Sequence, residues 1–465
     1  MLQRILIIMI SASLFSFSNG NAAELLRFTV QDTDNFALEY IKNRNLSKEV
    51  FMEEYTKKLG KLSASERQCR NDAFIEHVKK FAPEWLSEFS SMDRALALPD
   101  GHYLSLLAAQ NWQEPEKHEC TSWIMMPDLT KDKNLLIHKN RDSKATKHAP
   151  AWVKRPGKIG WVGSCSLLSP FPLMGINEKG LAVMMNNADA YDGWNTSGLP
   201  TPMITRIMLE NCSTCQEAAS LLEKILAEKA YYHGKTGSIF FLAEPELAGV
   251  YEFSATKSAY FPFTFGYAIR ANTWQLPGMV ASSKKTATQV AGDDFREYQV
   301  RDALMAAVKR GGIEVEDCFA ASRLRGGDLA KQLFPVCWAN STAFATFEID
   351  REFPELHTMY LASGPSRNTI VIPIPIGAAA LPAKMFSGEW TALAQDFKAK
   401  AGMDHDKLPE IEKVEKELCA EYRLVKEKTR ALLRQGKKQE AISLLQNALA
   451  KHFAMAEKAY DTIIK

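Results

Sequence analysis

The spacing of hydrophobic and polar residues divides the chain into helical, strand-rich and again helical parts. Apolar residues recur every three or four positions in KEVFMEEYTKKLGKL and ERQCRNDAFIEHVKKFAPEWLSEF, which predicts a mostly helical segment over 24–119. Ser63 or Ser65 can cap the second of these helices. Residues 386–465 are again dense in helix formers, and we expect Gly436 to divide them into two antiparallel helices.

The middle of the chain, residues 120–375, has the pattern of strands. Short runs rich in β-branched and aromatic residues, such as IGWVGSCSLL, GSIFFLA, AGVYEF and TIVIPIPI, are separated by clusters of Gly, Pro and Asn. Helical stretches are expected to interrupt them at 203–229 and 293–310. This order of elements predicts an α+β protein with two layers of sheet and flanking helices.

The first residues have the layout of a secretory signal peptide. A single basic residue precedes the apolar run ILIIMISASLFSF, and small residues follow near Ala22 and Ala23. The alternative, an uncleaved anchor, is weaker because the apolar run is short for a membrane span. We therefore predict a signal peptide over 1–23 and an exported protein, periplasmic or secreted, with no membrane segment after signal removal.

Composition and motifs exclude several classes of protein. The 465 residues carry 57 Lys and Arg against 55 Asp and Glu, and 46% are hydrophobic, so the chain is globular rather than disordered or collagen-like. Near-zero net charge gives no long-range attraction to nucleic acid, which we do not expect as a partner. The sequence has no HExxH, Walker A or GxSxG motif, and Asp404-His405-Asp406 fits a polar turn. We expect no metal and no cofactor.

The sequence holds eight cysteines and a single CxxC motif, Cys212-Ser-Thr-Cys215. Metal binding would require a second pair or well-spaced His ligands, which the sequence lacks. A redox pair is one interpretation in an exported protein. The other is the start of a helix, because Ser213 or Thr214 can cap the run QEAASLLEKILAEKA.

A candidate nucleophile, Cys120, stands where the first helical part ends. A free thiol, with a pKa of about 8.5, is only partly ionised at neutral pH and needs a base. If the chain is cut between Glu119 and Cys120, the new α-amino group, with a pKa of about 7.7–8, lies beside its own thiol. It can take the thiol proton and later donate a proton to a leaving amine, so no distant His is required.

Other polar residues follow in an order that suits amide chemistry. Asp142, on the next predicted strand, can orient the α-ammonium group. Asn187 and Asn272 can donate their side-chain amides to the oxyanion of a tetrahedral intermediate. The cation Arg296 can tether the carboxylates or bind an anionic substrate. We further predict a set of substrate-binding residues: Lys139, Asn186, Trp274 and Arg301.

In their order and separations, these residues resemble the amino-terminal-nucleophile (Ntn) linear amide hydrolases. The resemblance covers roughly residues 65–375 and is strongest to the penicillin acyltransferase family (acyl-CoA:6-aminopenicillanic acid acyltransferases), which is related to the choloylglycine hydrolases. The long helical segment that ends in LLAAQNWQEPEKHECTSW favours this branch. The resemblance implies self-cleavage before Cys120 and a four-layer αββα sandwich, with an N-terminal helical pro-segment and a C-terminal helical hairpin.

The resemblance also assigns roles to individual residues. Lys139-Asn140-Arg141-Asp142 matches the family's polar–Asn–x–Asp strand. NEKGLAV followed by Asn matches the first oxyanion Asn, which is Asn187 with Asn186 as fallback, and Ala271-Asn272 matches the second. The family's later Arg corresponds to Arg296 or Arg301. Two positions depart from the pattern: Glu119 stands where penicillin acyltransferase precursors have Gly, and Lys139 where bile salt hydrolases have Arg.

Together these observations predict an exported, self-processing enzyme that acts on a small-molecule linear amide through a Cys120 thioester. Its expected organisation is a signal peptide (1–23), a helical pro-segment (24–119), an Ntn-hydrolase domain (120–385) and a helical extension (386–465). The alternatives are a secreted dipeptidase with an N-terminal Cys, a catalytically silent binding protein of the same fold, and a helical adaptor built on the extension. Association of copies into a homo-oligomer is left open.

Overall fold

The computed structural model describes residues 23–26, 33–109, 119–143, 148–192, 198–231, 236–327 and 333–464. The predicted signal peptide lies outside the described residues, apart from Ala23. Within the described residues, no helix is long and apolar enough to cross a membrane. The same residues contain no group of three or more His, Cys, Asp or Glu side chains that could hold a metal ion.

The segment before Cys120 is helical, as its periodicity predicts. Its described elements are the short strand β1 (Leu25–Leu26) and the helices α1 (Thr33–Asn43), α2 (Lys48–Leu59), α3 (Ala64–Phe81), α4 (Trp85–Ala95) and α5 (His102–Ala108). Ser63, rather than Ser65, caps α3: its hydroxyl accepts from the Glu66 amide, and the Glu66 carboxylate accepts from the Ser63 amide.

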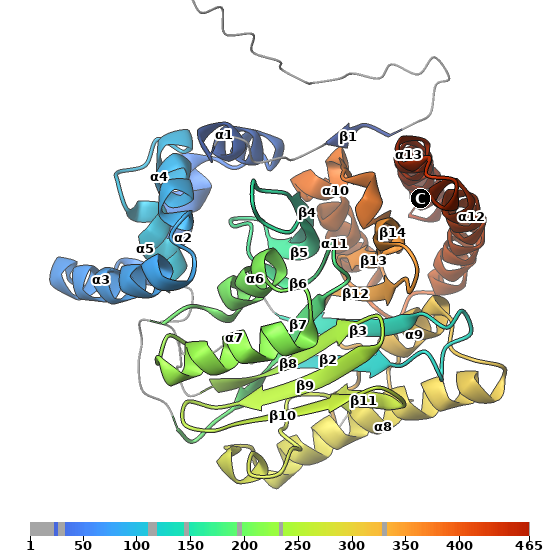
Figure 1. Cartoon of the computed structure of the whole chain (residues 1–465), viewed down its shortest axis with the longest axis horizontal. Coiled ribbons are helices and arrows are strands. Elements are labelled where there is room, and N and C mark those ends of the chain that lie inside the picture. The colour runs from blue at the N-terminus through green and yellow to red at the C-terminus, as the bar shows by residue number, and fades with distance from the viewer. Residues whose placement is uncertain are drawn as a thin grey trace, which may run out of the picture.

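Two antiparallel sheets form the middle of the molecule (Figure 1). The first has the order β10-β9-β8-β7-β6-β5-β4, and the second β11-β2-β3-β12-β13-β14. The strands of the first sheet are β4 (His148–Val153), β5 (Trp161–Ser166), β6 (Pro172–Asn177), β7 (Ala182–Asp189), β8 (Thr236–Glu244), β9 (Leu247–Phe253) and β10 (Ser258–Phe263). Those of the second are β2 (Glu119–Met125), β3 (Leu135–Asp142), β11 (Tyr267–Arg270), β12 (Ser341–Ile349), β13 (Thr358–Ser363) and β14 (Ile372–Pro375), while β15 (Leu381–Pro382) pairs with β1.

The two sheets face each other, because β2 and β3 contact β7 and β8. The helices α6 (Thr201–Asn211) and α7 (Cys215–Ala227) contact the seven-stranded sheet, and α8 (Ala287–Lys309) and α9 (Val315–Ser322) contact the six-stranded sheet. The predicted α+β class with antiparallel sheets is therefore confirmed, and these contacts are consistent with the expected four layers. The eight-residue α9 was not predicted, because it is too short to show a helical period.

The C-terminal helices pack on the two sheets: the first of the four contacts β4 of the seven-stranded sheet, and the other three contact the six-stranded sheet. They are α10 (Ala383–Ser387), α11 (Glu389–Ala401), α12 (Leu408–Arg434) and α13 (Lys438–Ile463), and Gly436, at φ +74°, separates the last two as predicted. Both α12 and α13 contact β14. The buried Arg323 guanidinium binds both carboxylate oxygens of Glu415 on α12, at 2.6 and 2.7 Å. The extension thus covers part of the core.

A buried cluster of charges joins the N-terminal helices to the rest of the protein. Arg206 of α6 forms two hydrogen bonds to the Glu88 carboxylate of α4, at 2.9 and 3.0 Å, and a third to Glu210 at 2.8 Å. Arg155 also pairs with Glu88. All four side chains are buried, so the pairing offsets the cost of removing these charges from water.

The CxxC motif marks the start of a helix. Cys212 follows the last residue of α6, Cys215 is the first residue of α7, and the Thr214 hydroxyl accepts from the Glu217 amide at 3.2 Å. Both thiols are free. Burial raises the pKa of Cys212 to about 12, which makes it a poor redox nucleophile. The helix-start interpretation holds, with Thr214 rather than Ser213 as the cap.

Candidate active site

Cys120 is the second residue of β2, in the interior of the six-stranded sheet and 2% exposed. It lies opposite Arg141 of β3, and Ser122 lies opposite Lys139. Because side chains alternate along a strand, these four residues share one face of the sheet. The Ser122 hydroxyl and Asn186 of β7 form a hydrogen bond of 2.8 Å, so this face is turned toward the other sheet. The Cys120 thiol is thereby directed between the two sheets.

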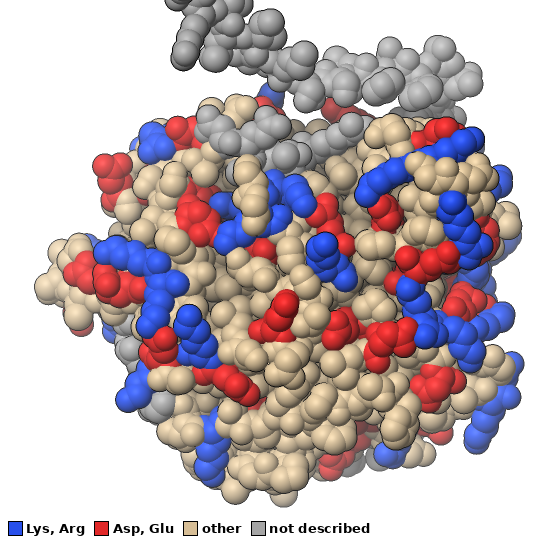
Figure 2. Space-filling model, viewed as in Figure 1, with Lys and Arg blue, Asp and Glu red and all other residues tan. Residues whose placement is uncertain are grey.

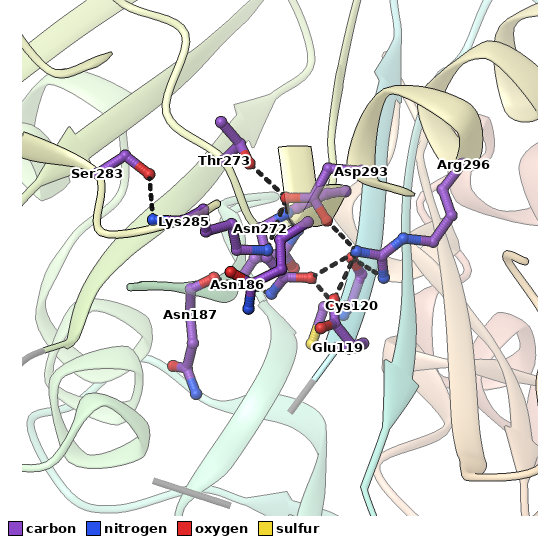
Figure 3. A network of polar contacts seen from close by, with 12 residues as sticks. Glu119, Cys120, Asn186, Asn187, Asn272, Thr273, Ser283, Lys285, Asp293 and Arg296 are labelled. Carbon is purple, nitrogen blue, oxygen red and sulfur yellow. Dashed lines mark hydrogen bonds and ion pairs between the residues drawn. The ribbon is translucent and has the colours of Figure 1, made fainter. Parts of the chain in front are cut away.

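Asn272 holds the nitrogen of the peptide bond between Glu119 and Cys120. The Cys120 amide donates to Asn272 Oδ1 at 2.8 Å, and Asn272 Nδ2 donates to the main-chain carbonyl of Asn187 at 2.8 Å (Figure 3). Figure 3 shows the Asn187 side-chain amide directed away from Asn272. Asn272 thus positions the nitrogen of the predicted cleavage site, and its role as an oxyanion donor stays a prediction, as does that of Asn187.

Arg296 of α8 binds both sides of the same peptide bond. Its Nη2 donates to Glu119 Oε2 at 2.5 Å and to Asn272 Oδ1 at 3.2 Å, and its Nη1 donates to the Cys120 carbonyl at 3.3 Å. It also pairs with Asp293, one helical turn earlier. Burial disfavours the guanidinium charge, but Asp293, Glu119 and Asp142 outweigh that effect and raise the pKa of Arg296.

Asp142 lies directly opposite Glu119 in the β2–β3 register. Its Oδ1 accepts from the Ser341 hydroxyl at 2.5 Å, and its Oδ2 is buried without a hydrogen-bond partner among the described residues. Burial raises the pKa of Asp142 to about 7, and the Glu119 carboxylate adds to the shift. Asp142 therefore lies across the strand pair from the residue before the predicted cleavage site, with one carboxyl oxygen that has no partner among the described residues.

Lys139 and Asn186 form a buried bridge between the two sheets. Lys139 Nζ donates to the Met185 carbonyl at 2.5 Å and to Asn186 Oδ1 at 2.8 Å. Asn186 Nδ2 donates to the carbonyls of Arg270 and Ala271, at 3.0 and 2.8 Å. Burial lowers the pKa of Lys139, while the neighbouring Cys120 thiol opposes that shift. Both N–H groups and the oxygen of the Asn186 side-chain amide already have partners. Asn186 therefore holds Lys139 and the main chain at the end of β11, and not a substrate.

Two predicted substrate-binding residues are not brought to this site. Trp274 is 1% exposed, and its indole N–H donates to the Ser238 carbonyl at 3.5 Å. Its ring packs so closely on Gly237 that a Cβ there would lie 2.3 Å from it. Arg301 is exposed on α8 and stacks over Tyr298. Five residues after Arg296, it points about 140° away around the helix, so Arg296 is the arginine that meets Cys120.

The structure adds two charged residues that the sequence analysis did not select. Asp293 Oδ2 accepts from Lys285 Nζ at 2.7 Å and from the Asn272 amide at 3.3 Å. Burial opposes ionisation of Asp293, but Arg296 and Lys285 hold its pKa below the ordinary value. The spacing of Asp293 and Arg296, three residues apart in the helical stretch DDFREY, was a usable signal, since such residues are neighbours on a helix. Lys285 lies in a loop, where no periodicity could indicate it.

The cluster has the parts that thiol attack on an amide requires. Cys120 offers a thiol between the sheets, and Asn272 holds the nitrogen that cleavage would turn into an α-amine. Asp142 has a free oxygen for that nitrogen once it carries a charge, and Arg296 and Lys139 stabilise negative charge nearby. In the intact chain the nitrogen is an amide and cannot accept a proton. The chemistry therefore depends on cleavage before Cys120.

Comparison with known proteins agrees with this picture over part of the chain. Residues 131–284 match the family model of acyl-coenzyme A:6-aminopenicillanic acid acyl-transferases. The predicted resemblance is thus confirmed for a region that contains Lys139, Asp142, Asn187 and Asn272, whereas Cys120 and Arg296 lie outside it. A comparison with curated proteins finds no match.

Solved structures with a similar fold include two variants of the conjugated bile acid hydrolase from Clostridium perfringens. They are 15% and 14% identical to this chain, and in each case the match covers 55% of this chain and 92% of the hydrolase, with a TM-score of 0.38. A Caenorhabditis elegans ortholog of N-acylethanolamine-hydrolyzing acid amidase is 14% identical, with coverages of 49% and 92% and a TM-score of 0.34. At such scores the superpositions carry no argument about chemistry.

Proposed function

We propose that this chain is the precursor of an exported Ntn amide hydrolase, which cuts itself between Glu119 and Cys120 and then hydrolyses small linear amides. The observation that carries the proposal is the environment of this one peptide bond. Its nitrogen is held by Asn272 at 2.8 Å, Arg296 contacts both of its flanking residues, and an unpaired oxygen of Asp142 lies across the strand pair.

Self-cleavage would begin with attack of Cys120 Sγ on the Glu119 carbonyl carbon. A C–S bond forms, the C–N bond to Cys120 breaks, and the thiol proton passes to the nitrogen, which becomes an α-amine. Water then hydrolyses the Glu119 thioester, leaving a carboxylate on Glu119 and a free thiol on Cys120. Asn272 holds the nitrogen throughout, so the leaving group stays where it must act next as a base.

In turnover the α-amine would take the Cys120 proton while Sγ attacks the substrate carbonyl. The resulting ammonium returns that proton to the leaving amine, and water completes the cycle by hydrolysing the thioester. Asp142 would orient the ammonium through its free oxygen. Asn187 and Asn272 remain the proposed oxyanion donors, which requires Asn272 Nδ2 to leave the Asn187 carbonyl or Asn187 to turn its amide inward.

The family match supports either amide hydrolysis or acyl transfer to an amine. Hydrolysis is the better proposal for an exported protein, because acyl-CoA is a cytoplasmic acyl donor whereas water is always available. A dipeptidase with an N-terminal Cys would use the same groups and differ only in what the pocket accepts. The proposed steps use only groups of this chain and water.

A catalytically silent binding protein is the second candidate, and the Glu119 contact favours it. Glu119 is held by Arg296 at 2.5 Å, and Cys120 is 2% exposed, so self-cleavage would have to take place at a buried bond beside a charged contact. A protein that never cuts itself would keep this arrangement permanently. The two proposals therefore differ in whether the Glu119–Cys120 peptide bond is cut.

Denaturing intact mass and amino-terminal sequencing of the purified protein test the proposal. The native chain should yield a fragment of about 39 kDa that starts at Cys120, which is the share of the 52.1 kDa mass after residue 119. Cys120→Ala should stay uncut and inactive. Cys69→Ala, which removes an exposed thiol in α3, is the matched control and should process normally. An uncut native chain would favour the binding protein.

A further inference from the structure

Glu119 would be the acyl group of the enzyme's first reaction. During self-cleavage its carbonyl carbon is bonded to Cys120 Sγ, which is the position a substrate acyl group takes in every later cycle. The residues that contact the Glu119 side chain in the precursor are therefore candidates to contact the substrate's acyl chain. We propose that the active site binds substrates whose acyl group ends in a carboxylate, and that Arg296 binds this carboxylate as it binds that of Glu119 in the precursor. This inference rests on the proposed function.

The contact is a built one rather than a surface ion pair. Arg296 is 1% exposed, and its Nη2 lies 2.5 Å from Glu119 Oε2 (Figure 3). The same guanidinium donates to the main-chain carbonyl of Cys120 at 3.3 Å, so it contacts the residue that carries the proposed nucleophile. Its Nε is buried without a hydrogen-bond partner among the described residues, which leaves a further donor for an anion.

The charges around the bond favour an anionic replacement for Glu119. In the precursor, Arg296 and Lys285 face the carboxylates of Asp293 and Glu119. Once the Glu119 carboxylate is displaced after cleavage, Arg296 and Lys285 share the Asp293 carboxylate, and an excess of buried positive charge is unfavourable in a low-dielectric site. A carboxylate on the incoming acyl chain restores the balance, whereas a neutral chain does not.

The covalent structure of Glu119 also sets the length of the acyl chain. Its Cα, Cβ and Cγ separate the carbonyl carbon from the carboxylate carbon. The matching simple acyl group is glutaryl, a dicarboxylic acid with three methylenes between its carboxyl carbons. The inferred substrate class is therefore monoamides of dicarboxylic acids of this length, including α-amides of glutamate.

The test compares chromogenic amides with the processed wild-type enzyme. Glutaryl-4-nitroanilide should be hydrolysed with a kcat/KM at least about tenfold above that of pentanoyl-4-nitroanilide, as expected for one charge-assisted contact. Among succinyl, glutaryl and adipyl anilides, the glutaryl compound should be best. Equal or better hydrolysis of the pentanoyl compound would overturn this inference alone, whereas processed enzyme that cleaves no amide would overturn the proposed function with it.

Variants on α8 and at the cleavage site test whether the preference for glutaryl substrates comes from the contact with Arg296. Arg296→Gln should lose most of the ratio between glutaryl and pentanoyl substrates, while Arg310→Gln, an exposed arginine after the same helix, should keep it. Glu119→Gln leaves an identical Cys120-terminal chain, so it should slow self-cleavage by about tenfold yet show the wild-type substrate ratio. If Arg296→Gln fails to process, the chain-length series on the wild type still decides the inference.

Discussion

Asn272 is the residue on which the proposed site depends most after Cys120 itself. It connects the Cys120 nitrogen to the main chain of β7, with 2.8 Å contacts on each side. Asn272→Ala should slow turnover by about a hundredfold, the usual loss for one positioned polar group at a reacting amide. Single-turnover amide hydrolysis measures this, with self-cleavage followed by mass. Asn211→Ala, at the exposed end of α6, is the control, and a similar loss there would show that the effect is not local.

The burial of Asp142 should make the precursor's stability depend on pH. Its folded pKa, about 7, lies above the ordinary value of 3.8, so the folded chain keeps this proton over a wider range than the unfolded chain. The free energy of unfolding should therefore fall as pH rises from about 4 to about 7, and the contribution of this group should be constant above that. The size of the loss is on the order of 2–4 kcal/mol.

Urea unfolding of the uncut Cys120→Ala chain measures this dependence, and the Cys120→Ala/Asp142→Asn double variant is its reference. The Asn variant has no proton to lose at this position, so the difference between the two chains isolates Asp142. If both chains show the same slope between pH 4 and 7, the buried carboxyl is not the titrating group. Glu297, whose pKa burial also raises to about 7, is common to both chains and cancels.

Among the elements, α4 and α6 are joined by the buried ion pairs of Glu88, Arg206 and Glu210. Glu88→Ala leaves the buried Arg206 and Arg155 with the Glu210 carboxylate alone. The expected loss is about 3–5 kcal/mol in the free energy of unfolding, because an uncompensated charge stays buried. Urea unfolding provides the measurement.

A matched acidic residue on the neighbouring helix controls for the general effect of removing a carboxylate. Glu76 of α3 pairs with Lys79, but its side chain is 70% exposed. Glu76→Ala should change stability by less than about 1 kcal/mol, since an exposed pair contributes little. Equal losses from the two variants would mean that the buried cluster adds nothing specific.

At the scale of the whole molecule, the contacts predict that the segment before Cys120 stays bound after cleavage. Arg44 of the segment after α1 donates to the carbonyls of Phe386 and Pro150, at 2.5 and 3.0 Å, and β1 pairs with β15. The two fragments of the processed protein should therefore elute together in size-exclusion chromatography without denaturant and separate in urea. Elution of the larger fragment alone under native conditions would contradict this prediction.

The surface and the C-terminal helices bear on association with partners. On the face shown in Figure 2, acidic and basic side chains are interspersed, so this face presents no broad field of one sign. The helical extension contributes buried residues such as Trp390 and Phe453 to the common core. Its removal would therefore expose apolar surface and destabilise the sheet beneath it, which disfavours the helical-adaptor interpretation.

Much of the architecture could be predicted from local patterns. The helical segments, the strand-rich middle and the break at Gly436 follow from periodicity and capping, which act over a few residues. Each of the two helix caps could be narrowed to a pair of residues, and the structure selects Ser63 and Thr214. The short α9 and the packing of α12 and α13 on β14 could not be predicted, because they depend on which surfaces meet after the chain has folded.

The order of the elements and the types of residue available for chemistry could be predicted without a structure, since both depend on neighbours along the chain. Which of those residues meet depends on how the chain packs in three dimensions, and the structure settles it. It chose Arg296 over Arg301 through the angle between them on one helix, placed Trp274 in the core, and brought Asp293 and Lys285 to the Glu119–Cys120 bond. The contacts of Arg296 with Glu119 and of Asn272 with Cys120 join residues 177 and 152 positions apart. The pairing of β11 with β2 and the packing of α8 on β11 bring them together.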